Sequence, residues 1–229
     1  MLKQFGLILA LITSLLLYST LSYAGPKQQH FIKKIQPAIK KANQQIMQKR
    51  QRLKKLYRQH KDNKTLKKSD KHWLNQLASR YNVKIPDWSK DTTWKKLNKR
   101  VDIVPLSLAT AQAAIESAWG QSRFAKQANN FFGQHCYKKG CGLVPHRRAK
   151  HRSFEVRKFA SPLGSVKSYI HNLNTGNTYK HLRNIRYQLR QQNKPLSGSA
   201  MAAGLDDYSQ SPTYIKNLRS IIKQYKLQN

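Results

Sequence analysis

Apolar residues recur at intervals of three, four and seven between residues 27 and 60, which predicts one long amphipathic helix. Pro37 lies early in this stretch, where a helix start or a kink can accommodate it. The remaining positions are basic, with eleven Lys or Arg and no acid. The helix therefore packs its apolar stripe on the rest of the chain or binds an anion, and packing is the favoured interpretation. The stripe consists of Phe31, Ile35, Ile39, Ala42, Ile46, Leu53 and Tyr57.

The next stretch, residues 61–98, predicts a polar linker, one short helix and turns. Apolar spacing from Trp73 to Tyr81 indicates the short helix. Small and aromatic residues become more frequent from there on, so we place the main domain at 99–229 and a basic helical segment at 25–98.

The main domain shows helical patterns bounded by Pro, Ser and Gly. The first helix covers residues 105–119, with Gly120 as its C-cap. The helical pattern fails between 140 and 160, where residues 153–159 indicate a small hairpin with Phe154 and Val156 on one face. We therefore predict a mainly α (α+β) fold, a helical domain with a small β-hairpin lobe. Three more helices are expected after Ser161-Pro162, from Tyr179 to Leu189, and after Ser211-Pro212.

The first 24 residues have the pattern of an export signal. Lys3 precedes an apolar run, and Ser22 and Ala24 place small residues at a cleavage site after Ala24. An uncleaved anchor is the alternative, but the run is short for a membrane span and contains Ser14. We expect an exported protein, periplasmic or extracellular.

The chain is strongly basic, with 44 Lys or Arg, nine acids and a formal charge of +35. Signal removal takes away only Lys3, which leaves +34. Such a charge attracts polyanions. Outside the cytoplasm these are cell-wall polymers or anionic lipids, although the charge alone could simply maintain solubility. Nucleic-acid binding is not expected, because the chain shows no RNA-binding or helix-turn-helix motif.

The two cysteines, Cys136 and Cys141, are expected to form a disulfide, because nearby pairs in exported proteins usually do so. The closed loop is short, so the entropic contribution is about 2 kcal/mol. The alternative is a zinc site with His135 and His146, but this spacing fits no common zinc pattern. We predict no metal and no other cofactor.

Carboxylates are scarce, and only two of them are glutamates, Glu116 and Glu155. Glu116 lies near the end of an apolar helix, with small residues such as Ala113 on its face and Trp119 nearby. A carboxyl beside an indole and poor in water stays protonated near neutral pH, as a general acid must. The alternative is a helix-end glutamate paired with a cation such as Arg123.

Several segments resemble the glucosaminidase family (glycoside hydrolase family 73), over roughly residues 100–227. The run AQAAIESAWG at 111–120 resembles that family's catalytic-helix motif, and NNFFG at 129–133 resembles its next motif. YSQSPTY at 208–214 resembles its late tyrosine motif. The loop at 135–145, with Asn172-Leu173-Asn174-Thr175, is similar to the Bax-like branch. Phe159, Ser165, Val166 and Tyr169 match the family's aromatic and helix-start pattern.

This resemblance implies a lysozyme-like fold with a cleft, and endo-acting cleavage after N-acetylglucosamine in peptidoglycan. Glu116 falls on the general acid. Glu155 is the candidate for the second carboxylate, although neighbouring arginines such as Arg148 could pair with it. If Glu155 is remote, the acetamido group of the substrate could act as nucleophile. Asp206 and Asp207 are outside candidates for which a turn role is favoured.

The resemblance also assigns Tyr208 to the cleft, where it could orient the acetamido group, and a buried tyrosine at a helix start is the alternative. Peptidoglycan is the expected partner, and a monomer is the expected state. The competing functions are a non-catalytic wall- or polyanion-binding protein and a lytic transglycosylase. The implied substrate-binding residues are Trp119, Asn130, Phe132 and Tyr214; for Phe132 a core role is favoured, and Trp119 could serve either role.

Overall fold

The structure, a computed structural model, describes residues 25–227 apart from 147 and 149–151. The predicted export signal lies outside the described residues. The described chain is mainly helical with one small antiparallel sheet, which confirms the predicted fold class. The elements are α1 (Pro26–Lys61), α2 (Lys68–Arg80), α3 (Asp91–Arg100), α4 (Leu106–Glu116), α5 (Arg123–Ala128), β1 (His135–Cys136), β2 (Gly142–Leu143), β3 (Glu155–Arg157), α6 (Pro162–Thr175), η1 (Asn177–Tyr179), α7 (Lys180–Gln191), α8 (Gly198–Met201), η2 (Ala202–Gly204) and α9 (Tyr214–Gln224).

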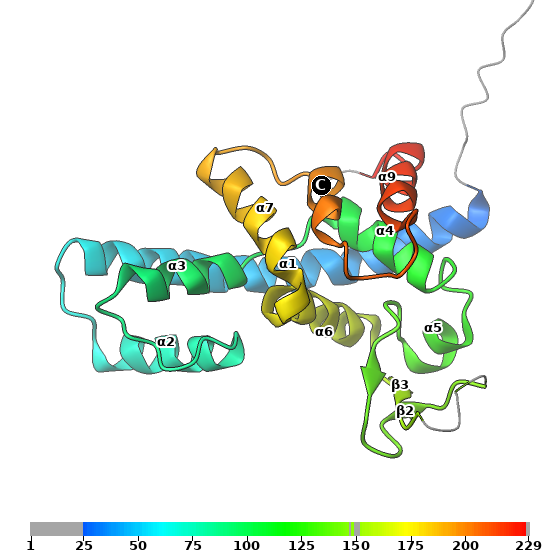
Figure 1. The fold of residues 1–229 in the computed structure, drawn as a ribbon, viewed down its shortest axis with the longest axis horizontal. Coiled ribbons are helices and arrows are strands. Elements are labelled where there is room, and N and C mark those ends of the chain that lie inside the picture. The colour runs from blue at the N-terminus through cyan, green and yellow to red at the C-terminus, as the bar shows by residue number, and fades with distance from the viewer. Residues whose placement is uncertain (1–24, 147, 149–151, 228–229) are drawn as a thin grey trace, which may run out of the picture.

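Helix α1 is the long helix that the apolar spacing predicts, and it passes through Pro37 without ending. It runs along the long dimension of the molecule and packs against α3, α4 and α6 (Figure 1). Its buried face follows the predicted stripe except at the C-terminal end, where Arg50 and Leu56 are buried and Tyr57 is half-buried. The basic segment therefore docks on the main domain and shares its core. No described helix is both long and apolar enough to cross a membrane.

Helix α4 is buried on every side from Ser107 to Ala114, as expected of a helix at the centre of a domain. Helices α1, α8 and α9 contact it. The predicted end at residue 119 is wrong, because α4 ends at Glu116. Ala118, Trp119 and Gly120 all have positive φ, which turns the chain away from the helix axis.

The β-lobe is a three-stranded antiparallel sheet in the order β1-β3-β2. Val156, in the central strand, pairs with His135 of β1 and Leu143 of β2. The predicted hairpin within residues 153–159 is therefore wrong in its pairing: that segment supplies a single strand, and both partners come from earlier in the chain.

Two more helical boundaries differ from the sequence interpretation. Residues 91–93, which carry cap chemistry, begin a full helix, α3, whose Trp94 is buried, and the expected domain boundary at 99 falls inside it. Helix α9 begins at Tyr214 rather than directly after Ser211-Pro212. Both differences matter, because α3 leads into the central ion pairs and the α9 start carries Tyr214 to the site.

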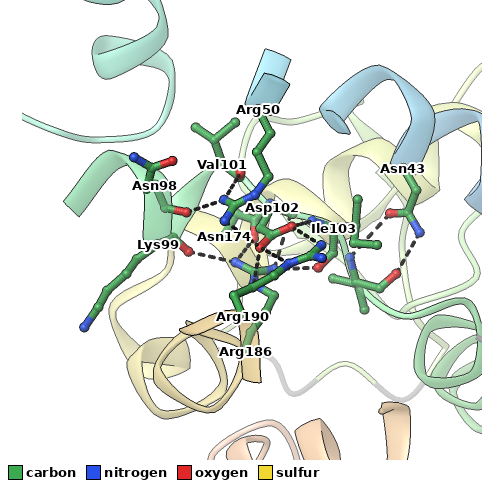
Figure 2. Close-up of polar contacts among 11 residues, drawn as sticks. Asn43, Arg50, Asn98, Lys99, Val101, Asp102, Ile103, Asn174, Arg186 and Arg190 are labelled. Carbon is green, nitrogen blue, oxygen red and sulfur yellow. Dashed lines mark hydrogen bonds and ion pairs between the residues drawn. The ribbon is translucent and has the colours of Figure 1, made fainter. Parts of the chain in front are cut away.

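A buried carboxylate, Asp102, joins the N-terminal segment to the main domain (Figure 2). It lies in the loop between α3 and α4, and its exposed fraction is 2%. Arg190 binds it through two hydrogen bonds of 3.0 and 3.2 Å. Arg50 of α1 and Arg186 of α7 approach the same carboxylate at 3.4 and 4.0 Å. One acid therefore holds three helical arginines from two different helices.

Backbone carbonyls satisfy the remaining donors of these arginines. Arg50 donates to Asn98 O and Val101 O, at 2.6 and 2.9 Å. Arg186 donates to Lys99 O and Ile103 O, at 2.9 and 2.8 Å. Burial alone would raise the pKa of Asp102, but the three guanidinium groups outweigh it and lower the pKa below its usual value.

We predict that Asp102→Asn destabilises the fold by about 3–5 kcal/mol, because it leaves three arginines without their carboxylate in a buried place. Asp62→Asn is the control, since Asp62 pairs with Lys64 at the exposed end of α1 and should change stability by less than about 1 kcal/mol. Urea unfolding of both variants measures the difference.

The same carboxylate sets a pH dependence. Because its folded pKa is lowered, its contribution is present above the unfolded pKa and is lost as pH falls through the folded one. Acid should therefore destabilise the wild-type protein more than Asp102→Asn. Equal acid sensitivity of the two proteins would contradict this role.

Candidate active site

Glu116 ends the buried helix α4 and is half-buried at the wall of a cleft of about 570 Å³. Of the nine acids in the sequence, it is the one that lines this cleft among the described residues. The cleft lies between the helical part of the chain and the β-lobe, and is lined by Glu116, Phe132, Gly133, Gln134, His135, Tyr137, Arg157, Ser168, Tyr169, His171, Asn172, Thr175, Tyr179 and Tyr208.

Burial raises the pKa of Glu116 above its usual value, and a hydrogen bond from Tyr214 opposes this shift in part. Its place at the C-terminal end of α4 acts in the same direction as burial, because the helix dipole disfavours a negative charge there. The predicted raised pKa is therefore confirmed. Its cause differs from the sequence interpretation, since the surrounding residues and not Trp119 remove the water.

A chain of hydrogen bonds runs from the core to Glu116. The Tyr169 hydroxyl donates to Gln112 Oε1, and Gln112 Nε2 donates to the Tyr214 hydroxyl at 3.1 Å. Tyr214 in turn donates to Glu116 Oε1 at 2.7 Å. Each group donates to the next, so Oε1 is held as an acceptor and Oε2 is left for the proton of the neutral acid. Sequence reasoning missed Gln112, although its position one turn before Glu116 could have indicated it.

The turn after α5 places Gly133 beside Glu116. Asn129 and Gly133 both have positive φ. The buried side chain of Asn130 donates to Gln134 O and Arg157 O, at 2.8 and 2.9 Å, which ties the turn to β3. A Cβ at Gly133 would lie 3.8 Å from Glu116 Oε2. Asn130 is therefore near the cleft as a support of its wall and is not among its lining residues.

Aromatic rings form the floor of the cleft near Glu116. Phe132 stacks on Tyr169 with centroids 3.9 Å apart. The Tyr208 hydroxyl donates to Phe132 O at 3.3 Å, and the Tyr208 ring stacks on Tyr214 at 5.6 Å. The structure thus brings together four of the predicted site residues, namely Glu116, Phe132, Tyr208 and Tyr214.

Trp119 lies outside the lining of the cleft. Its ring packs edge-on against Phe31 of α1 at 5.8 Å and against Tyr225 at 4.6 Å. This contact follows from the turn after Glu116, which points residue 119 toward α1 and the C-terminal helix. The indole therefore helps to hold α1 on the main domain.

Glu155 also lies outside that lining, in the central strand of the sheet. Its two oxygens accept hydrogen bonds from Gly140 N at 2.9 Å and Gly142 N at 2.7 Å. These amides lower the pKa of Glu155 below its usual value, in the opposite direction to Glu116. The structure does not bring the two glutamates together, and it accounts for Glu155 as an anchor of the loop between β1 and β2.

The predicted disulfide between Cys136 and Cys141 is present in the same loop, with Cα atoms 6.2 Å apart. Both sulfurs are used in this bond, so the alternative zinc site lacks its thiolates. The His135 ring stacks on Phe154 at 4.1 Å. Of the two outside candidates, Asp206 pairs with His181 at 3.0 Å and Asp207 is exposed, and neither lines the cleft.

Comparison with known proteins supports the resemblance found in the sequence. The family described as Glucosaminidase (mannosyl-glycoprotein endo-beta-N-acetylglucosaminidase) matches residues 91–227, which is more than half of the chain. Protein bax of Escherichia coli (strain K12) is 33% identical over 184 residues, which cover 80% of this chain and 64% of that relative. The catalytic domain of the autolysin Auto from Listeria monocytogenes is 19% identical, with a TM-score of 0.42 over 74% of this chain and 94% of that one.

We predict that Tyr214→Phe raises the pKa of Glu116 further, because it removes the hydrogen bond that stabilises the charged form. Since the chain holds only two glutamates, NMR of protein labelled with ¹³C at the glutamate carboxyls shows two titrating signals. Tyr225→Phe is the control, and the Glu155 signal is an internal reference. A Glu116 titration unchanged by Tyr214→Phe would contradict the geometry.

Proposed function

The chain belongs to the glucosaminidase family, and from this premise we propose that it is an endo-β-N-acetylglucosaminidase that hydrolyses peptidoglycan strands after N-acetylglucosamine. The observation that carries the proposal is Glu116, a half-buried carboxyl with a raised pKa on the wall of a 570 Å³ cleft. A carboxyl kept neutral near physiological pH can protonate a glycosidic oxygen. The 64% coverage of Protein bax is why substrate and linkage stay part of the proposal.

The hydrogen bonds around Glu116 favour one of its oxygens as the donor. Oε1 accepts from Tyr214, so the acidic proton resides on Oε2, beside Gly133. This proton passes to the glycosidic oxygen as the C–O bond breaks, and the anomeric carbon becomes positively charged. Water then supplies the new hydroxyl and returns a proton to Glu116. The Tyr214 hydroxyl stabilises the carboxylate in the interval.

For the second catalytic group we favour the acetamido group of the substrate over Glu155. Glu155 is occupied by two backbone amides, whereas Tyr208 lines the cleft near Glu116 and could orient an acetamido group. Phe132 offers a ring face to the sugar, while Asn130 and Tyr214 position the groups that touch it. Trp119, outside the cleft, acts through packing.

Export follows from the substrate, because peptidoglycan lies outside the cytoplasm, and the signal pattern of residues 1–24 agrees with it. The formal charge of +35 would draw the protein to anionic wall polymers or lipids at low salt. We propose a monomer that works without metal or organic cofactor and does not bind nucleic acid.

One observation favours a second candidate, a lytic transglycosylase. Such an enzyme needs one acid and no water, and Glu116 is the single carboxylate among the described lining residues. Mass spectrometry of the products separates the two reactions. A reducing N-acetylglucosamine end supports hydrolysis, whereas a 1,6-anhydro-muramic end supports the transglycosylase.

We predict that Glu116→Gln folds normally and cleaves peptidoglycan at least about 10²-fold more slowly, because an amide has no acidic proton to donate. Zymograms and the release of soluble fragments from purified peptidoglycan measure the rate, and thermal unfolding checks the fold. Undiminished clearing by this variant would overturn the assignment of the acid.

Glu155→Gln is the matched substitution at the other glutamate. We expect a loss of less than about tenfold in the same assay, because the amide still accepts one of the two loop hydrogen bonds and no proton transfer is removed. A loss as large as that of Glu116→Gln, with normal thermal unfolding, would instead make Glu155 the second catalytic carboxylate.

A further inference from the structure

Two more hollows adjoin the cleft on the side of the N-terminal segment. The first, of about 180 Å³, lies between α1, α2 and α6 and shares His171 with the cleft. The second, of about 750 Å³, lies along α2 and shares Lys49 and Arg80 with the first. A molecule in the cleft can therefore extend past His171 without leaving the surface of the protein.

The smaller hollow is cationic and contains no acid. Its lining includes Lys49 of α1, Arg80 of α2 and Lys167 of α6, which we call the cationic pocket together with His171. In the described part of the chain, no hydrogen bond or ion pair joins any of the three cations to an acid. Burial lowers the pKa of Lys49, and the charges of Arg80 and Lys167 lower it further.

This uncompensated charge contrasts with the treatment of cations elsewhere in the molecule. Arg50, Arg186 and Arg190 converge on Asp102, and the first two also donate to backbone carbonyls (Figure 2). The cationic pocket has the opposite arrangement, in which like charges face one another across a hollow. Repulsion of this kind costs stability, and an anion from outside the chain would relieve it.

The pocket is formed jointly by the N-terminal segment and the family domain. Lys49 and Arg80 lie before residue 91, where the match to the glucosaminidase family begins, whereas Lys167 and His171 lie within it. Docking of α1 and α2 therefore adds a charged extension to a cleft whose acid belongs to the family domain. Besides completing the core, this segment could select which substrate strands are bound.

We propose that the cationic pocket binds a carboxylate of the peptide attached to the glycan strand in the cleft. This inference rests on the proposed function, because it assigns the neighbouring cleft to the glycan. The volume of 180 Å³ is below the roughly 300–1,000 Å³ of ordinary ligand pockets and suits a terminal group better than a sugar ring. A covalently attached peptide brings such a group to His171, next to the cleft.

The test compares binding of peptide-bearing glycan strands with that of the same strands after an amidase has removed the peptides. Binding is measured by calorimetry on the full chain carrying Glu116→Gln, so that no strand is cut. The substitutions Lys49→Gln, Arg80→Gln and Lys167→Gln are then combined in this background. We expect affinity for peptide-bearing strands to fall about fivefold to tenfold, and affinity for bare strands to stay unchanged.

The control removes three positive charges elsewhere, with Lys33→Gln, Lys40→Gln and Lys216→Gln. These lysines are exposed and line none of the three hollows. This variant should keep the wild-type difference between the two kinds of strand. The difference should also shrink with added salt, because exposed ion pairs are screened.

Three outcomes would overturn the inference: no preference for peptide-bearing strands, an equal loss of affinity for both kinds of strand in the pocket variant, or the same loss in the control variant. The cleavage assay on the protein with Glu116 intact is read separately. If that protein releases no fragments while the binding preference depends on the pocket, then the proposed function fails and the peptide-binding pocket stands.

Discussion

The carboxylate of Asp102 lies where α1, α6, α7 and the loop into α4 meet, and three arginines converge on it. Two charges of one sign would repel one another in a buried place, so removal of this single acid would leave Arg50, Arg186 and Arg190 opposed. The same junction fixes the point at which α4 enters the core. Because α4 is buried on all sides, its direction then determines where Glu116 emerges.

A chain with nine acids and 44 basic residues has few carboxylates to distribute, and the structure gives three of them different environments. Asp102 is held charged by arginines, Glu155 is held charged by backbone amides, and burial keeps Glu116 neutral more easily. These are the three ways in which a protein shifts a pKa. Most other buried cationic donors bond to carbonyl oxygens, so cations left unpaired on the surface stand out.

The sequence allowed a large part of this to be predicted. The stripe from Phe31 to Leu53 gave α1, because a period of 3.6 residues is set by local backbone geometry. Glu116 was found from its apolar surroundings and the family motif around it. The end of α4 was missed, because Trp119 has apolar character that fits a helix, while its packing on Phe31 favours a turn. Sequence could not have shown that β3 pairs with two strands that precede it.

The sequence by itself determined the class of fold, the long basic helix, the disulfide and the presence of one conspicuous acid, because each depends on local spacing or on residue type. Only the tertiary structure decided the partners of that acid. Tyr214 and Gln112 are 102 residues apart in the chain yet share a hydrogen bond, and Glu155 faces its own loop instead of the cleft. Such contacts arise from packing between distant segments, to which no local periodicity refers.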